Sequence, residues 1–173
     1  MNNMRRILFL VSVLFLTFVL QAQDFSYLKD IDLNNAEEML QAEEAAMECC
    51  CYLVAVRYDK KDIQRQYASS YIHKWIVQPF GDEKIVCDVI TQITEDRKEL
   101  IDMYLAFYVM SYLDGDKQVG KTSLRQEALI GVIEYCSVSS NKLKLTKEMK
   151  LIKQYHENGN MNQYLQDITL SSR

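Results

Sequence analysis

The sequence contains one proline and only five glycines among its 173 residues. A β-sandwich or β-barrel needs a turn roughly every eight to twelve residues, and turns rely heavily on these two residue types. The shortage argues against a fold of many short strands. It favours long helices joined by few connections.

An excess of basic residues is also missing. The chain has 20 Lys and Arg against 24 Asp and Glu, which gives a formal net charge of −4 at neutral pH. Its basic residues are dispersed, so no positively charged surface for nucleic acid is expected. An anionic membrane surface is not an expected partner either.

One long apolar run is present, and it lies at the N-terminus. Two arginines precede residues 7–20, which are almost wholly apolar and are followed by a small residue and a polar segment. This order is typical of a secretory signal peptide, and the run is shorter than the roughly 17–25 residues that cross a bilayer. We expect residues 1–22 to be cleaved after Ala22. Residues 23–173 then form a single exported domain, periplasmic or secreted and without a stable membrane anchor; retention of the segment as an anchor is the alternative.

Apolar residues recur at helical spacing along most of the remaining chain. Asn35 is expected to cap a first helix, whose apolar positions extend to Tyr58. Asp62 is expected to cap a second helix, which must end near Pro79 because the residue before a proline avoids α geometry. A third, shorter helix is expected to start at Asp82.

The central helix is expected at about residues 95–113, with Thr94 as its N-cap and two acidic residues in its first turn. Its second half is almost entirely apolar, so this helix should lie near the centre of the core. Asp102 is one of its few polar residues. It is expected either as a buried acid or facing outward beside Arg97 or Lys98.

Two further helices and a short one are expected after the central helix. Ser123 and Gln126 resemble a capping box, and Thr146 is expected to cap a helix that stops at Gly159. A short final helix is expected near residues 161–168. The sequence therefore predicts an all-α fold of six to seven helices, arranged as an irregular bundle or as stacked antiparallel helix pairs.

A phosphate-loop motif follows the central helix. Gly115, Gly120, Lys121 and Thr122 satisfy the pattern G-x-x-x-x-G-K-[ST]. The stretch GDKQVGKTSL resembles the loop of small GTP-binding proteins. The resemblance implies that Lys121 contacts the β and γ phosphates and that Thr122 binds Mg²⁺.

The surroundings of this motif favour a different interpretation. In the GTP-binding family a short buried strand precedes the loop, whereas here a long capped run starting at Thr94 precedes it. Only 51 residues follow Thr122, and Lys144 stands where a guanine-binding N-K-x-D motif needs Asp. We therefore expect a connecting loop. Nucleotide binding at residues 115–122 is an alternative function.

All five cysteines lie in the part expected to be exported: Cys49, Cys50, Cys51, Cys87 and Cys136. In an oxidising compartment they could pair as disulfides, with one thiol left over, and a thiol-dependent redox protein is a second alternative function. The simpler interpretation is that Cys50 and Cys51 are small core residues. No histidine stands at zinc-ligand spacing from a cysteine, so neither a metal nor a cofactor is expected.

No complete catalytic set is found. His156 begins an H-E-x-x-H pattern, but Asn160 occupies the place of the second histidine. Ser70 and His73 lie one helical turn apart without a third orienting group. We therefore expect the protein not to be an enzyme.

Two rows of aromatic residues recur at four-residue spacing: Tyr67, Tyr71 and Trp75, and Tyr104, Tyr108 and Tyr112. Such rows provide rigid contact area with polar tips, and they could bind a protein, peptide or glycan. They could equally be amphipathic edges of the core. The sequence thus predicts an exported, non-enzymatic binding or protein-interaction module, with the aromatic rows as the expected contact surface.

Overall fold

The computed structural model of the chain describes residues 24–33, 39–80, 85–115, 120–161 and 164. Within these ranges the regular structure is helical, and none of their residues lies in a strand. Six of the helices in the described part have seven or more residues. The predicted all-α class is confirmed.

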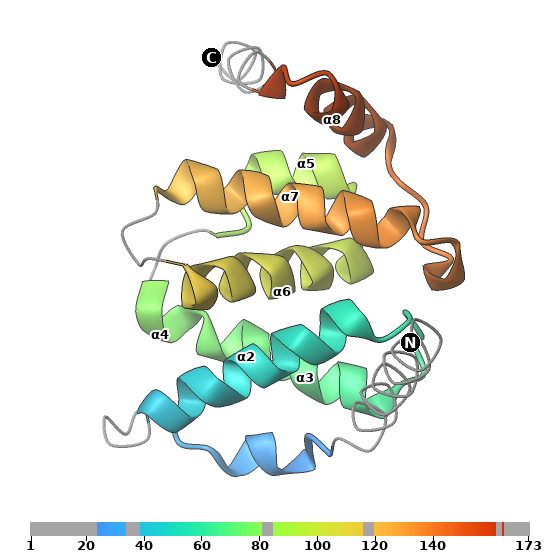
Figure 1. Cartoon of the computed structure of the whole chain (residues 1–173). Helices are drawn as coiled ribbons and strands as arrows, with labels where there is room; N and C mark the ends of the chain where they lie inside the picture. The colour runs from blue at the N-terminus through green and yellow to red at the C-terminus, as the bar shows by residue number, and fades with distance from the viewer. Residues whose placement is uncertain (1–23, 34–38, 81–84, 116–119, 162–163, 165–173) are drawn as a thin grey trace, which may run out of the picture.

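The helices follow one another along the chain with short connections (Figure 1). They are η1 (Ser26–Asp30), α2 (Met39–Ala55), α3 (Ile63–Trp75), α4 (Val77–Phe80), α5 (Asp88–Thr94), α6 (Lys98–Asp114), α7 (Lys121–Ser137), η3 (Ser139–Asn141) and α8 (Lys147–Glu157), where η marks a 3₁₀ helix. In Figure 1, α2 and α3 run antiparallel, as do α6 and α7. The expected stacking of antiparallel helix pairs is therefore the observed arrangement. Among the described residues, no helix has the length and apolar character needed to cross a membrane.

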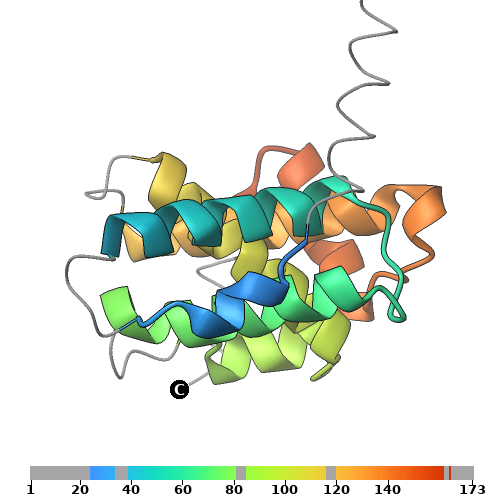
Figure 2. The same cartoon turned by 90° about the horizontal axis from the view of Figure 1, so that it is seen from below.

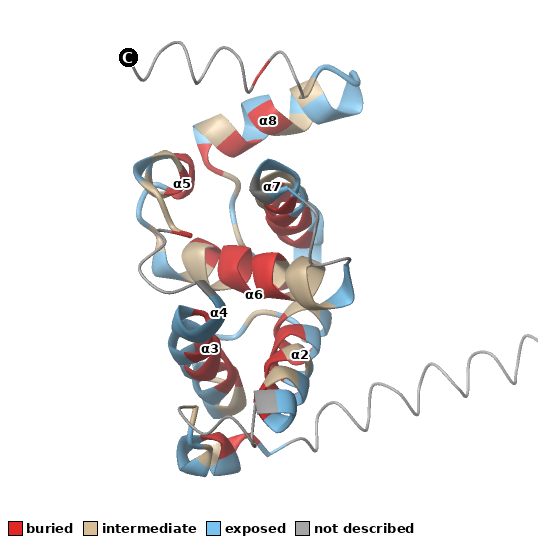
Figure 3. Cartoon of the chain, turned by 90° about the vertical axis from the view of Figure 1, so that its left-hand side faces the viewer, coloured by how far each residue is buried: buried red, intermediate tan, exposed pale blue. Residues whose placement is uncertain are grey.

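Helix α6 lies at the centre of the fold. It contacts α2 and α3 on one side and α7 and α5 on the other, and Figure 3 shows buried residues along most of its length. Helix α8 packs against α5 and α7, while η1 lies along α3 at the opposite end (Figure 2). Phe25, just before η1, is fully buried with its ring edge-on to Tyr52. The predicted role of the central helix is confirmed.

The start of α6 differs from the prediction. Thr94 is not its N-cap but the last residue of α5, and its hydroxyl donates to the carbonyl oxygen of Ile90 at 2.8 Å. Glu95 and Asp96 follow with left-handed φ values of 53° and 52°, and α6 begins only after Arg97. A threonine hydroxyl can donate to the carbonyl group one turn earlier, or it can accept from an amide N–H further along the chain. The presence of a threonine therefore did not decide whether Thr94 ends one helix or begins the next.

Two other helices begin at positions different from those predicted. Helix α7 starts at Lys121 with Gly120 as its N-cap, so Ser123 lies inside the first turn and is not its cap. Helix α5 starts at Asp88 with Cys87 as its N-cap. Neither Cys87 nor Gly120 makes a side-chain capping hydrogen bond. The sequence around these two helix starts therefore lacks the polar N-cap residue that usually marks the start of a helix.

Other predicted boundaries are confirmed or lie outside the described residues. Asp62 caps α3 by accepting two backbone N–H bonds, and the hydroxyl of Thr146 accepts the N–H of Met149 at 3.1 Å. Helix α2 ends at Ala55, so Tyr58 lies in the following loop and not in the helix. The predicted starts at Asn35 and Asp82, the signal segment 1–22 and most of residues 161–168 lie outside the described residues.

Candidate functional site

Most of the aromatic residues expected to form a contact surface are buried. Tyr71, Trp75, Tyr104 and Tyr108 each expose 3 % or less of their surface. Tyr67 is exposed, and Tyr112 is half-buried with its ring tilted against Trp75. Because α6 has helices on opposite sides, its aromatic row faces a neighbour and not solvent. The prediction of an aromatic contact surface is corrected: these side chains hold the core together.

The phosphate-loop motif lies between two helices. Gly115 is the C-cap of α6 and Gly120 the N-cap of α7, while residues 116–119 lie outside the described residues. Lys121 and Thr122 were expected to lie in the loop, but they are the first two residues of α7. Helix α6 stands where the GTP-binding family has a strand, so the resemblance does not extend to the element that precedes the loop.

All five cysteines are free thiols. Cys49, Cys50 and Cys136 are buried, Cys87 is half-buried and Cys51 is exposed. The expectation that Cys51 is a core residue is therefore wrong, and α2 turns Cys49 inward instead. Burial raises the pKa of Cys136 to about 11 and also raises the pKa of Cys51. Since the thiolate is the reactive form, a raised pKa makes a thiol less reactive at neutral pH.

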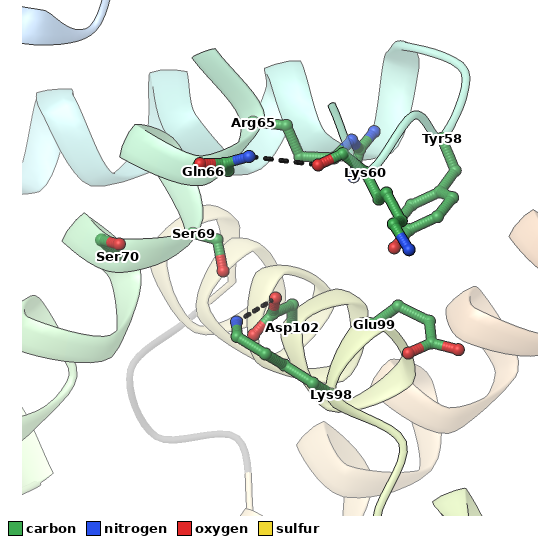
Figure 4. A pocket seen from close by; sticks show the side chains of 9 residues that line it. All are labelled: Tyr58, Lys60, Arg65, Gln66, Ser69, Ser70, Lys98, Glu99 and Asp102. Carbon is green, nitrogen blue, oxygen red and sulfur yellow. Dashed lines mark hydrogen bonds and ion pairs between the residues drawn. The ribbon is translucent and has the colours of Figure 1, made fainter. Parts of the chain in front are cut away.

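A polar groove of about 400 Å³ lies between α3, the loop that precedes it and the first half of α6 (Figure 4). All nine residues that line it carry a polar group on the side chain. The charged ones are Lys60, Arg65, Lys98, Glu99 and Asp102. The groove therefore combines charges of both signs that come from two different helices and a loop.

Local hydrogen bonds hold the loop that forms one wall of the groove. Asp62 caps α3 at the end of this loop. The side-chain amide of Gln66 donates to the carbonyl oxygen of Lys60 at 3.1 Å, as Figure 4 shows. The backbone N–H of Tyr58 donates to the side-chain oxygen of Asn141 at 3.3 Å. The wall is thus tied to α3 and to η3.

Arg65 lies at the inner end of the groove and is only 5 % exposed. Its Nη2 donates to the carbonyl oxygens of Leu53 at 3.0 Å and Val56 at 2.8 Å, and to the hydroxyl of Tyr135 at 3.0 Å. The guanidinium carbon lies 5.3 Å from the centre of the Tyr58 ring. Leu53 lies in the last turn of α2 and Val56 directly follows that helix, where unpaired carbonyl groups and the helix dipole favour a cation.

Arg65 has no carboxylate partner among the described residues. Its Nη1 reaches the sulfur of Met103 at 3.4 Å, and its Nε has no hydrogen-bond partner. Buried arginines are normally paired with an acid. In the part of the chain that the structure describes, the positive charge of Arg65 is offset by neutral acceptors and by aromatic rings.

Both carboxylates of the groove, in contrast, are already paired. Asp102 accepts hydrogen bonds from His73 Nε2 at 2.8 Å and from Lys98 Nζ at 2.7 Å. Glu99 accepts from the Nε and Nη2 of Arg97 at 2.9 and 2.7 Å. Burial alone would raise the pKa of each carboxyl group, but the hydrogen bonds outweigh it and lower both pKa values. Both groups are therefore negatively charged at neutral pH. Asp102 is half-buried and paired with Lys98, so each of the two expectations was right in part.

The contact between His73 and Asp102 supplies an orienting carboxylate that the sequence did not reveal. Ser70 lines the groove one turn before His73. No hydrogen bond joins its hydroxyl to His73 among those of the described residues. A serine nucleophile requires a base within hydrogen-bond reach, and this arrangement joins the histidine to an acid only.

Replacing Asp102 with Asn should lower the free energy of unfolding by about 1–2 kcal/mol at neutral pH, because two charge-assisted hydrogen bonds lose their charged acceptor. The folded-state pKa of Asp102 lies below its ordinary value of 3.8. Its stabilisation is therefore present above about pH 4 and is lost as the pH falls through the folded-state pKa. The variant should accordingly lose less stability than the wild type between about pH 5 and pH 3.

Urea unfolding at a series of pH values measures this difference. Glu127→Gln is the matched control, because Glu127 is an exposed acid on α7. Its acid-dependent loss of stability should equal that of the wild type. Equal losses for Asp102→Asn and wild type would contradict the role assigned to Asp102.

Sequence reasoning missed the groove and its buried arginine. The available signal was position: Arg65 lies on the same face of α3 as Ser69 and Ile72, and all three are buried.

Comparisons with known protein families, with curated proteins and with solved structures found no match to this chain. The geometry of the groove is therefore the basis for a functional proposal.

Proposed function

We propose that this protein is an exported, non-enzymatic binding module whose ligand-contacting surface is the polar groove between α3 and α6. The observation that carries the proposal is the buried guanidinium of Arg65 at the inner end of the groove, which has no carboxylate partner in the described part of the chain. Buried polar groups without a full set of partners are uncommon in folded proteins. A ligand in the groove would supply what is missing.

The charge pairs of the groove favour binding over catalysis. General acid–base catalysis needs a group whose pKa lies near the working pH. The carboxyl groups of Asp102 and Glu99 instead have lowered pKa values and are held by cations. Such fixed charges orient a ligand but take no proton from it at neutral pH.

Export rests on the N-terminal sequence. The apolar run at residues 7–20 and the small residue Ala22 form the pattern of a cleavable signal. Intact-mass measurement of the full chain after production in an exporting bacterial host tests this part of the proposal. Loss of residues 1–22 supports it, and an uncleaved chain in the cytoplasmic fraction contradicts it.

Blocking the groove tests the binding site. Ser70 lines the groove and its side chain is exposed, so Ser70→Tyr should fill the opening without disturbing the core. Thermal-shift measurements with a panel of sugars, amino acids, short peptides and Mg-nucleotides should give at least one stabilising ligand. Ser70→Tyr should weaken its binding about tenfold or more, because the added ring occupies the space that the ligand needs.

Thr122→Tyr is the matched control, because Thr122 is exposed and lies in the phosphate-loop motif away from the groove. It should leave binding unchanged. If Thr122→Tyr abolishes binding and Ser70→Tyr does not, the groove is not the site. That result would support nucleotide binding at residues 115–122 instead.

A further inference from the structure

Two cations in the groove remain without an acid. The carboxylate of Asp102 is paired with Lys98 and accepts a hydrogen bond from His73, and that of Glu99 is paired with Arg97. Lys60 and Arg65 make no ion pair with any described residue. The local charge of the groove is therefore positive, although the chain as a whole has a net charge of −4.

Two buried polar groups also face this space without full hydrogen bonding. Among the described residues, the Nε of Arg65 and the hydroxyl of Ser69 have no partner that meets hydrogen-bond geometry, and each residue is 5 % exposed. The Ser69 hydroxyl points from α3 toward Asp102 (Figure 4). Its interaction with the Asp102 carboxylate is one of the causes that lower the pKa of Asp102, after the hydrogen bonds from His73 and Lys98. Both residues line the groove, and a bound molecule would supply the partner that the Arg65 guanidinium lacks.

The arginine is held in place before any ligand arrives. Its Nη2 is fixed by the carbonyl oxygens of Leu53 and Val56 at the end of α2. Little conformational entropy remains to be lost at this group on binding. Lys60, in contrast, is exposed in the loop at the groove wall, where its flexible chain can close over a ligand.

From these observations we infer that the groove binds a small hydroxylated molecule bearing an oxyanion, such as a sugar acid or a sugar phosphate. Lys60 and Arg65 recognise the oxyanion, since a guanidinium and an ammonium are the usual partners of carboxylate and phosphate. Gln66 and Ser70 offer an amide and a hydroxyl to the neutral part of the ligand. A volume of about 400 Å³ suits a molecule of this size. This inference rests on the proposed binding function.

Isothermal titration of the purified protein with four probes tests the inference: glucuronate, glucose 6-phosphate, inorganic phosphate and glucose. At least one of the two sugar anions should bind about tenfold or more tightly than glucose, because glucose lacks the charge that Lys60 and Arg65 recognise. Binding of glucuronate alone identifies a carboxylate ligand, and binding of glucose 6-phosphate alone a phosphate ester. If inorganic phosphate binds as tightly as either sugar anion, the proposed contacts of Gln66 and Ser70 with the neutral part of the ligand are wrong.

Lys60→Gln is the decisive variant, because Lys60 is exposed and its loss leaves the core intact. It should weaken binding of the sugar anion about five- to tenfold and reduce the salt dependence of binding. Lys61→Gln, an exposed neighbour outside the groove lining, should have no effect.

The outcomes separate this inference from the proposed function. If glucose binds as tightly as the anions, or if Lys60→Gln changes nothing while Ser70→Tyr still blocks binding, the oxyanion inference fails and the binding groove stands. If no probe binds, the oxyanion inference also fails. If a probe binds and Ser70→Tyr leaves its affinity unchanged, both proposals fail.

Discussion

Arg65→Met should lower the free energy of unfolding by about 3–5 kcal/mol, because each hydrogen bond from a charged group contributes about 1.5–3 kcal/mol; this is a large part of the 5–15 kcal/mol that typically stabilises a domain. The guanidinium donates to two carbonyl oxygens at the end of α2 and to the hydroxyl of Tyr135 on α7. It therefore ties α2, α3 and α7 together. Its removal takes a donor from the carbonyl oxygens of Leu53 and Val56, although Val56 keeps the Tyr135 hydroxyl as a donor. A buried acceptor left without a donor costs about 1–3 kcal/mol.

Replacing a buried donor and all of its acceptors with apolar groups can leave the free energy of unfolding unchanged, but a single substitution at Arg65 cannot achieve this. The acceptors of Arg65 are mainly backbone carbonyl groups, which no substitution removes. Methionine matches the length of the aliphatic stem and fills the space, so the measured loss reports the hydrogen bonds more than a cavity. Urea unfolding monitored by circular dichroism gives the free energy directly.

Lys74→Met is the control for the loss of a cation from the same helix. Lys74 is exposed near the end of α3, so its replacement should change stability by about 0.5 kcal/mol or less. Tyr135→Phe should fall between the two variants, because it removes one hydroxyl that donates to Val56 and accepts from Arg65. A loss below about 1 kcal/mol for Arg65→Met would show that the α2 carbonyl groups find other partners.

This arrangement connects the fold to the groove. The end of α2 needs a cation for its carbonyl groups, and α3 supplies it from a buried position. The same guanidinium forms part of the groove lining, where it has no acid. The same guanidinium thus contributes to the positive charge of the groove and caps the C-terminal end of α2. Moving it would break its hydrogen bonds to α2 and lower the stability of the fold.

Helix periodicity and side-chain caps were predictable from the sequence. Asp62 and Thr146 were recognised because a capping side chain that accepts a backbone N–H is a local feature. The start of α6 was not predictable, because Glu95 and Asp96 adopt left-handed backbone conformations that favour glycine and that Glu rarely takes. Tyr58 fitted the apolar spacing of the first helix, although that helix ends at Ala55.

The groove could not be predicted, because its parts meet only through the packing of α3 on α6. His73 and Asp102 are 29 residues apart in the sequence, and their contact is 2.8 Å long. Periodicity identifies the residues that share a face of a helix. It does not say whether that face meets another helix or solvent, and the aromatic rows were misplaced for this reason.

Tyr104→Ala should lower the free energy of unfolding by about 3–5 kcal/mol, the usual cost of removing a large aromatic side chain from a core. Tyr104 is fully buried on α6, and the centre of its ring lies 6.0 Å from that of Tyr108. Its hydroxyl oxygen is 3.5 Å from the carbonyl oxygen of Ile85, the outer limit of a hydrogen bond. Tyr104→Phe should therefore cost less than about 1 kcal/mol, because the ring carries most of the stabilisation.

Tyr67 belongs to the other aromatic row and provides the matched control. It is 40 % exposed, so Tyr67→Ala should change the free energy of unfolding by about 0.5 kcal/mol or less. Urea unfolding under identical conditions compares the wild type with these three tyrosine variants. Since the two alanine variants remove the same atoms, their difference measures burial alone. Equal losses would mean that the Tyr104 ring is not packed in the core, and the aromatic rows would again be candidates for a contact surface.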